Sequence, residues 1–248
     1  MTDLAAVNPK RHAGRSWRRY TSYDFAAKDC IAPLTVAEIA SAAKNLPLAF
    51  VRQGDNFLLV AVLSLTPGTN LFVGSDGRWL GGYIPSVFRG YPFRLARGGK
   101  KNELLLCVDE DSGLVSKDRA GGEVFYDNDG KISGPVTEIL NFLTQVEKSR
   151  TATAVAVAAL ADANLLVDWP LKIKVEERDQ PVTGLYRVDE ARAQPSGRRA
   201  VSGDSKGRGP AGCLWPAAVH GQYSDSGKNG QDAGAEGGQG PGHQHHAG

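Results

Sequence analysis

Four segments of the chain show a regular pattern of apolar and polar residues. Residues 48–53 and 57–65 are apolar and are separated by a short turn sequence, which predicts a β-hairpin. Between residues 136 and 146, apolar side chains recur at helical spacing after a Gly-Pro pair, which predicts an amphipathic helix. Residues 171–176 alternate apolar and charged side chains and predict a half-exposed strand.

Weaker patterns predict the remaining elements. A capping box begins at Thr35 and predicts a helix that ends near Asn45, ahead of a proline. Strands first, then helices, then strands predict an α+β fold with a mostly antiparallel sheet and a few packed helices. The further expected elements are a short strand at 71–73, a strand that begins at Trp79, a buried strand at 104–108, a second helix at 151–163, and a strand at 184–188 that pairs with 171–176.

The composition changes sharply at Pro195. Residues 195–248 hold 14 of the 30 glycines and four of the five histidines, but almost no large aliphatic side chains. Such a segment buries too little apolar surface to offset the entropy lost on ordering. The sequence therefore predicts a globular domain at 1–194 and a disordered, glycine-rich tail at 195–248.

Charge and hydropathy exclude several classes of function. The 29 basic and 27 acidic residues nearly balance, so we expect no nucleic-acid partner. The longest apolar-rich stretch, 154–161, is far shorter than the ~20 residues that span a bilayer, which excludes an integral membrane permease. The N-terminal residues lack the apolar core of a secretion signal, so the expected location is the cytoplasm.

The spacing of cysteines and histidines gives no metal site. The three cysteines form no Cys-x-x-Cys pair, and His12, the single histidine before residue 195, is expected in a mobile N-terminal arm. A catalytic triad or a histidine-rich metal site is therefore not expected there. The His243–His246 cluster lies in the tail, and residues 127–130 are interpreted as a hairpin turn rather than a calcium loop. We expect no cofactor, no metal and no identifiable catalytic residue.

Two segments are candidates for a ligand site. Residues 83–94 interleave aromatic and arginine side chains and include two prolines that would fix the backbone, which is typical of a surface that stacks on sugars, peptides or bases. The densest acidic cluster follows the strand at 104–108, where paired carboxylates could act as acid and base. The alternative for residues 83–94 is a segment that packs in the core. The alternative for the acidic cluster is a solvated turn at the end of a strand. The candidate ligand-binding residues are Tyr83, Arg89, Tyr91, Arg94, Asp109 and Glu110.

Several of these segments, taken together and in order over residues 1–194, resemble the SapC family. Each segment alone is weak evidence for the family, but the whole set of segments in this order is specific for it. The segments that carry the resemblance are Val7-Asn8-Pro9, Tyr23-Asp24-Phe25-Ala26, Pro33-Leu34-Thr35, Asn70-Leu71-Phe72-Val73, Trp79, Tyr83-Ile84-Pro85, Tyr91-Pro92-Phe93, Leu106-Cys107-Val108-Asp109-Glu110, Gly184-Leu185 and Val188-Asp189-Glu190.

The resemblance implies a role near the cell surface but no defined reaction. Members of the family are linked with a surface layer or with peptide permeases, and the missing membrane spans argue against the second role. Our first hypothesis is a soluble accessory or binding protein connected with the cell surface or nutrient uptake, whose protein or small-molecule partner is unknown. A surface-layer structural protein is one alternative. A small hydrolase-like enzyme that uses Asp109, Glu110 and Arg89 in a groove is the other, although we expect no enzyme.

The sequence departs from the family after Gln194. Members of the family continue there with an amphipathic region, whereas this chain continues with the glycine-rich tail. Codons can be chosen for the tail so that a shifted reading frame restores the family sequence. We therefore hypothesise a frameshift near residues 191–197, which the DNA sequence would test.

Overall fold

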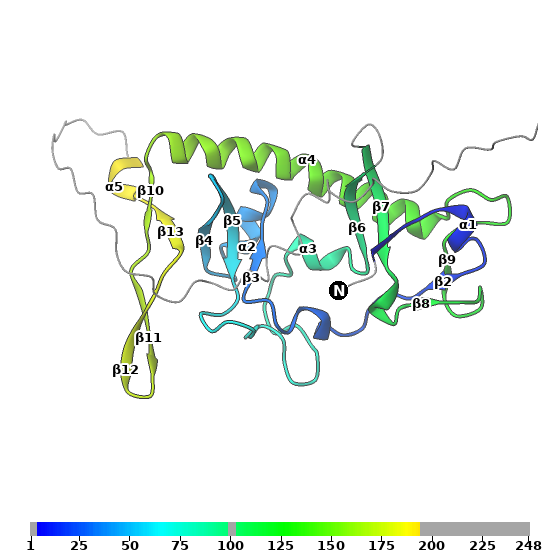
Figure 1. Cartoon of the computed structure of the whole chain (residues 1–248), viewed down its shortest axis with the longest axis horizontal. Helices are drawn as coiled ribbons and strands as arrows, with labels where there is room; N and C mark the ends of the chain where they lie inside the picture. The colour runs from blue at the N-terminus through cyan, green and yellow to red at the C-terminus, as the bar shows by residue number, and fades with distance from the viewer. Residues whose placement is uncertain (1–3, 99–102, 194–248) are drawn as a thin grey trace, which may run out of the picture.

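The structure, a computed structural model, describes residues 4–98 and 103–193 (Figure 1). Within these ranges antiparallel sheets combine with a few helices, which confirms the α+β prediction. The predictions for the tail, for the His243–His246 cluster and for the frameshift lie outside the described residues, apart from the first positions of the proposed frameshift segment.

A five-stranded sheet forms one half of the fold. Its strand order is β10-β13-β4-β5-β3, and each neighbouring pair is antiparallel. The predicted hairpin is confirmed as β4 and β5, whose turn includes Gly54 at a φ of 60°. The strands are β3 (Ile31–Pro33), β4 (Leu48–Gln53), β5 (Asn56–Val62), β10 (Leu166–Asp168) and β13 (Leu185–Val188).

Two three-stranded sheets form the other half. Their orders are β1-β7-β6 and β8-β2-β9, so the N-terminal strands β1 and β2 pair with segments about a hundred positions later. This pairing fixes the N-terminal segment against the acidic turn that follows β7. The strands are β1 (Leu4–Ala6), β2 (Ser16–Trp17), β6 (Phe93–Gly98), β7 (Glu103–Asp109), β8 (Val115–Ser116) and β9 (Glu123–Val124).

Most of the helical segments are short. The capping box is confirmed, although the segment is a 3₁₀ turn that continues as a helix and ends at Ala42, before the expected Asn45. The short segments are α1 (Pro9–His12), η1 (Asp24–Ala26), η2 (Val36–Glu38), α2 (Ile39–Ala42), α3 (Ser86–Arg89), η3 (Glu110–Ser112) and α5 (Glu190–Ala193).

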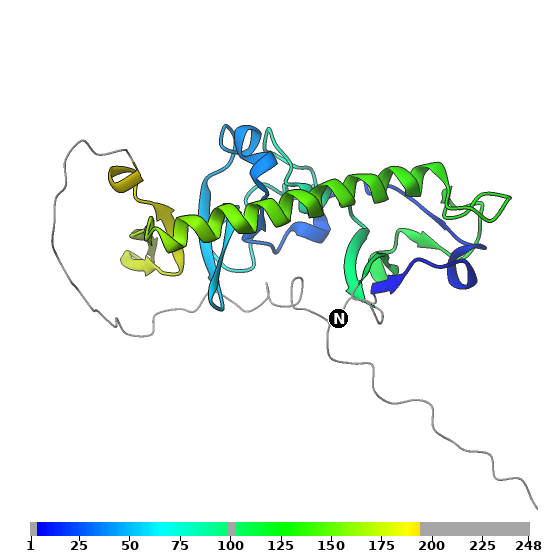
Figure 2. The same ribbon diagram turned by 90° about the horizontal axis from the view of Figure 1, so that it is seen from above.

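The long helix α4 (Gly134–Asp162) runs across both halves (Figures 1 and 2). Its start after the Gly-Pro pair is confirmed, but the prediction of a second, separate helix at 151–163 was wrong. The hydroxyls of Thr144, Thr151 and Thr153 each donate to the carbonyl four residues earlier. These bonds satisfy the polar side chains within the helix, so they do not interrupt it.

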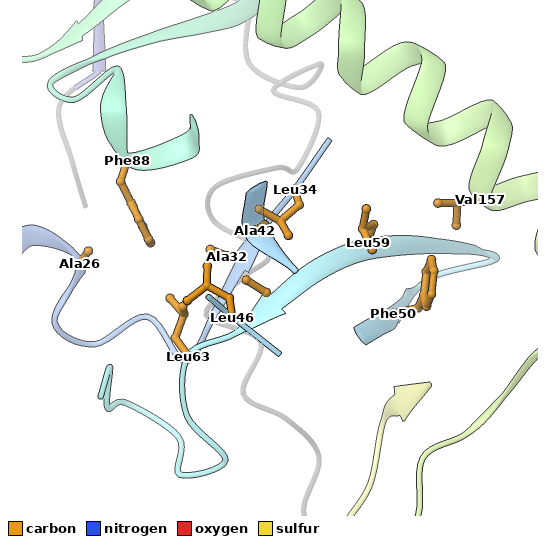
Figure 3. Close-up of a cluster of buried hydrophobic side chains, with 11 residues drawn as sticks. Ala26, Ala32, Leu34, Ala42, Leu46, Phe50, Leu59, Leu63, Phe88 and Val157 are labelled. Carbon is orange, nitrogen blue, oxygen red and sulfur yellow. The ribbon is translucent and has the colours of Figure 1, made fainter. Parts of the chain in front are cut away.

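Each end of α4 packs into a different hydrophobic core. Val136 lies at 0% exposure in one core with Trp17 and Phe93. Val157 lies in another core, drawn in Figure 3, with Phe50 and residues of the five-stranded sheet. A third cluster contains further buried apolar residues of that sheet, among them Val60. The helix therefore ties the two halves together through buried side chains.

The predicted partner of residues 171–176 was wrong. Strand β11 (Leu171–Val175) pairs with β12 (Arg178–Val182), whereas β13 pairs with β4 and β10. The turn between β11 and β12 consists of Glu176 and Glu177, both at positive φ. Hairpin turns are normally predicted from Gly, Asn or Asp at positions of positive φ. Because this turn has two glutamates there, the sequence did not indicate the hairpin.

Three further predictions need correction. Residues 71–73 and Trp79 form an isolated bridge between Val73 and Trp79, not strands. Strand β7 is buried only in its second half, and Leu104 at its start is 41% exposed. His12 lies in α1 at 0% exposure and not in a mobile arm, because α1 packs against the turn after β7.

Candidate functional site

Tyr83 belongs to a buried hydrogen-bond network around Glu38. The Glu38 carboxylate accepts from the Thr35 backbone N–H at 2.9 Å, as the capping box requires. It also accepts from the Tyr83 hydroxyl at 2.9 Å and from the Ser86 N–H and hydroxyl, both at 2.7 Å. Glu38 is 5% exposed, so this network fixes the start of α3 against η2. Tyr83 therefore serves to position α3.

A partly enclosed cavity of about 290 Å³ lies beyond α3, near the turn that follows β7. We call it the acidic cavity. Figure 1 shows α3 between the five-stranded sheet and strands β6 and β7, and the α3 residues Val87 and Phe88 line this cavity. The ring of Tyr91 stacks on Phe25 with centroids 3.9 Å apart and an interplanar angle of 11°. The cavity is lined by Phe25, Val87, Phe88, Tyr91, Arg94, Asp29, Asp109 and Asp111.

The three aspartates reach the acidic cavity from two distant segments. Asp29 precedes strand β3, whereas Asp109 ends β7 and Asp111 lies in η3. The Asp109 carboxylate accepts from the Asp111 backbone N–H at 3.1 Å, and the turn closes at Gly113 with a φ of 72°. The carboxylate of Asp29 makes no hydrogen bond or ion pair within the described residues, although Arg94 acts on it electrostatically.

Burial raises the pKa of two of these acids. For Asp29 the raised pKa is about 6, with burial as the largest cause and the positive charge of Arg94 opposing it. Burial also raises the pKa of Asp109, against the lowering effects of the Asp111 N–H and Arg94. Acids with raised pKa values that face a cavity are typical of functional sites.

Arg89 lines a second cavity, of about 250 Å³, which we call the basic cavity. Its guanidinium lies 5.1 Å from the ring centroid of Phe142 and 5.8 Å from that of Tyr83. It also donates to the Tyr83 hydroxyl at 3.4 Å. The basic cavity shares Tyr91 with the acidic cavity, and its other lining residues are Trp17, Arg19, Tyr20 and Ile139.

Glu110 is occupied by contacts with the N-terminal segment. Its carboxylate lies 2.7 Å from Nη2 of Arg11, 3.0 Å from Nη1 of Arg15 and 3.0 Å from Nε2 of His12. Hydrogen bonds from Arg11 lower the pKa of Glu110 to about 2, and Arg15 adds to this effect. Burial lowers the pKa of His12, which favours the neutral imidazole.

The structure thus separates the six candidate residues. Tyr91, Arg94 and Asp109 meet in the acidic cavity, Arg89 and Tyr91 meet in the basic cavity, and Tyr83 and Glu110 line neither. The predicted grouping of Asp109, Glu110 and Arg89 in one groove is therefore wrong, because Glu110 faces α1.

Sequence reasoning missed Asp29. Its only signal was an acidic side chain two positions before the short apolar strand β3. Nothing in the sequence connects that position with the turn after β7. The two segments meet in the fold at the acidic cavity.

The part of the chain that the structure describes has neither a metal-binding cluster nor a membrane-spanning helix. Across residues 4–98 and 103–193, no group of three or more His, Cys, Asp or Glu side chains is arranged to hold a metal ion. Over the same ranges, no helix combines the length and the apolar character needed to cross a bilayer.

The comparison with known families gives one match. The model of the SapC family matches residues 7–194, which is well over half of the chain and includes the strands and turns that line both cavities. No curated protein and no solved structure gives a significant match. On the extent of that match, the chain belongs to the SapC family.

Proposed function

We propose that this SapC-family chain is a binding or accessory protein that holds a small organic cation in the acidic cavity. The observation that carries the proposal is the carboxylate of Asp29, which lines this cavity together with Asp109 and has no hydrogen-bond or ion-pair partner among the described residues. Three carboxylates against the single guanidinium of Arg94 leave the lining with an excess of negative charge. A bound ammonium group would compensate that charge.

The aromatic wall supports the same class of ligand. Tyr91 and Phe25 present stacked rings beside the carboxylates, and Phe88 adds a third ring. Aromatic faces attract cations and also pack against apolar groups. A primary amine attached to a flat apolar body therefore matches both parts of the lining.

The test uses benzylamine as the probe and calorimetry with the full chain at pH 8, where Asp29 is ionised. We expect saturable binding that Asp29→Asn weakens by about tenfold, the effect of ~1.4 kcal/mol of lost charge interaction. Asp55→Asn is the matched control, since Asp55 lies in the exposed β4–β5 turn and should leave binding unchanged. Equal binding of benzyl alcohol, which has no charge, would refute the proposal.

A second candidate function rests on the raised pKa values of Asp29 and Asp109 in one cavity. Asp29, with a pKa of about 6, could exchange a proton near neutral pH, as a small hydrolase-like enzyme requires. In this chain the catalytic acid and base of such an enzyme would be Asp29 and Asp109, and Glu110 would take no part. Turnover of 4-nitrophenyl esters that Asp29→Asn and Asp109→Asn both abolish would support it, and turnover unaffected by either would reject it.

The connection with the cell surface or nutrient uptake is proposed on family membership alone. The cytoplasmic location and the surface-layer role expected from the sequence both stay predictions. Cell fractionation with an antibody against the chain separates them. A surface-layer protein would be recovered with the cell envelope, whereas an intracellular accessory protein would be recovered in the cytosolic fraction.

A further inference from the structure

The basic cavity has a lining opposite in charge to that of the acidic cavity. Arg19 and Arg89 contribute guanidinium groups, and no carboxylate is among the described residues that line it. Trp17, Tyr20 and Tyr91 supply aromatic surface, and Ile139 of α4 supplies an aliphatic side chain. Flat apolar surface beside positive charge is suited to an organic anion with an aromatic body.

The two arginines are not equivalent. Arg19 already pairs with Glu123, with Nε 2.8 Å from Oε1, and its Nη2 lies 3.7 Å from Glu138. Arg89 makes no ion pair within the described residues, and its contacts are the Tyr83 hydroxyl and two aromatic rings. Those neutral contacts orient the guanidinium without compensating its charge. Arg89 is therefore the group to which an anion would bind.

The indole of Trp17 adds an independent observation. Trp17 is 1% exposed, and its Nε1–H is the one buried side-chain nitrogen or oxygen without a hydrogen-bond partner in the described part of the chain. A buried donor without an acceptor costs about 1–3 kcal/mol. The residue that carries this donor also lines the basic cavity.

We infer that the basic cavity is a second ligand site, which takes an aromatic carboxylate with its carboxylate on Arg89 and its ring against Tyr20, Tyr91 and Trp17. The cavity volume of about 250 Å³ leaves room for a single-ring ligand. This site goes beyond the proposed function, because its ligand class and its residues differ from those of the acidic cavity except for Tyr91.

Benzoate is the probe, titrated into the full chain labelled with ¹⁵N at tryptophan. We expect saturable binding by calorimetry and a shift of the Trp17 indole signal, because Trp17 lines this cavity. Arg89→Gln should weaken binding at least tenfold. Arg52→Gln is the matched control, because Arg52 also lies over an aromatic ring, that of Phe57, on a distant hairpin.

Three outcomes would overturn the inference. They are the absence of saturable binding, equal affinity of Arg89→Gln and the wild type, and equal affinity for benzamide, the neutral analogue of benzoate. Circular dichroism of Arg89→Gln establishes that the variant is folded; if it is not, Arg89→Lys replaces it and should retain partial affinity. Saturable benzoate binding by Asp29→Asn would separate this result from the test of the acidic cavity.

Discussion

The Nε2 atom of His12 lies 3.0 Å from Oε1 of Glu110, and these two residues are 98 positions apart in the chain. The contact joins α1 to η3, the turn that carries Asp111 into the acidic cavity. Arg11 and Arg15 bind the same carboxylate. Glu110 therefore holds the acidic turn in place while its neighbours face the ligand site.

Glu110→Gln should lower the free energy of unfolding by about 2 kcal/mol at pH 7, because charge-assisted hydrogen bonds to a partly buried carboxylate are lost. The folded-state pKa of about 2 is below the unfolded value near 4.5. The contribution of Glu110 is thus complete above pH 4.5 and is lost as the pH falls towards 2. Urea denaturation of both proteins at several pH values measures this difference.

Glu103→Gln, at the exposed start of the same strand β7, is the control and should change stability by less than about 0.5 kcal/mol. A stability difference between Glu110→Gln and the wild type that is constant from pH 7 to pH 2.5 would contradict the ion-pair role of Glu110.

Asp29→Asn should stabilise the protein at pH 8 and leave it unchanged at pH 3. The folded-state pKa of Asp29 is raised to about 6 from 3.8, so its favourable contribution is present below pH 3.8 and is lost as the pH rises through 6. The amide avoids that loss because it carries no charge to bury. Melting temperatures of both proteins between pH 3 and pH 8 provide the measurement, and a lower melting temperature of Asp29→Asn at pH 8 would show that Arg94 compensates the charge.

Val157→Ala should cost about 2 kcal/mol, because the side chain is 4% exposed and its removal leaves a cavity in the core of Figure 3. Val155→Ala, two positions earlier in α4, is the matched control. Val155 is 69% exposed, so its truncation should change stability by less than about 0.5 kcal/mol. Similar losses for both variants in urea denaturation would mean that the helix faces are assigned incorrectly.

Glu38→Ala should destabilise the fold by about 3 kcal/mol or more, since Thr35, Tyr83 and Ser86 would lose their common acceptor in a buried position. Ser86→Ala removes one donor hydroxyl and should cost only about 1 kcal/mol. Chemical denaturation ranks the two variants. If Ser86→Ala is the more damaging change, Glu38 is not the centre of the network.

Elements defined by local sequence could be predicted. The hairpin of β4 and β5, the start of α4 and the capping box at Thr35 each depend on residues close together in the chain, and each is confirmed. The turn at 127–130 also has Gly130 at a φ of 76°, as the hairpin interpretation requires. In these cases turn and cap chemistry is decided by the segment itself.

Features that depend on distant contacts could not be predicted. The burial of His12 requires Glu110, and the acidic cavity requires Asp29 to meet the turn after β7. The packing of η2 on α4 depends in part on Thr153, which accepts from the Val36 backbone N–H at 2.8 Å, a contact across 117 positions. No pattern along one segment contains such information, so the candidate site was predicted in part only: Tyr91, Arg94 and Asp109 line one cavity, whereas Tyr83 and Glu110 line neither.

The position of α4 has a consequence for how the molecule denatures. The 29-residue helix α4 packs at one end into the core with Trp17 and at the other end into the core with Phe50. Unfolding of either end would expose apolar side chains of α4 and would weaken the packing of the opposite end. Heat should therefore produce one cooperative calorimetric transition for residues 4–193, shared by sheets that have no strand in common.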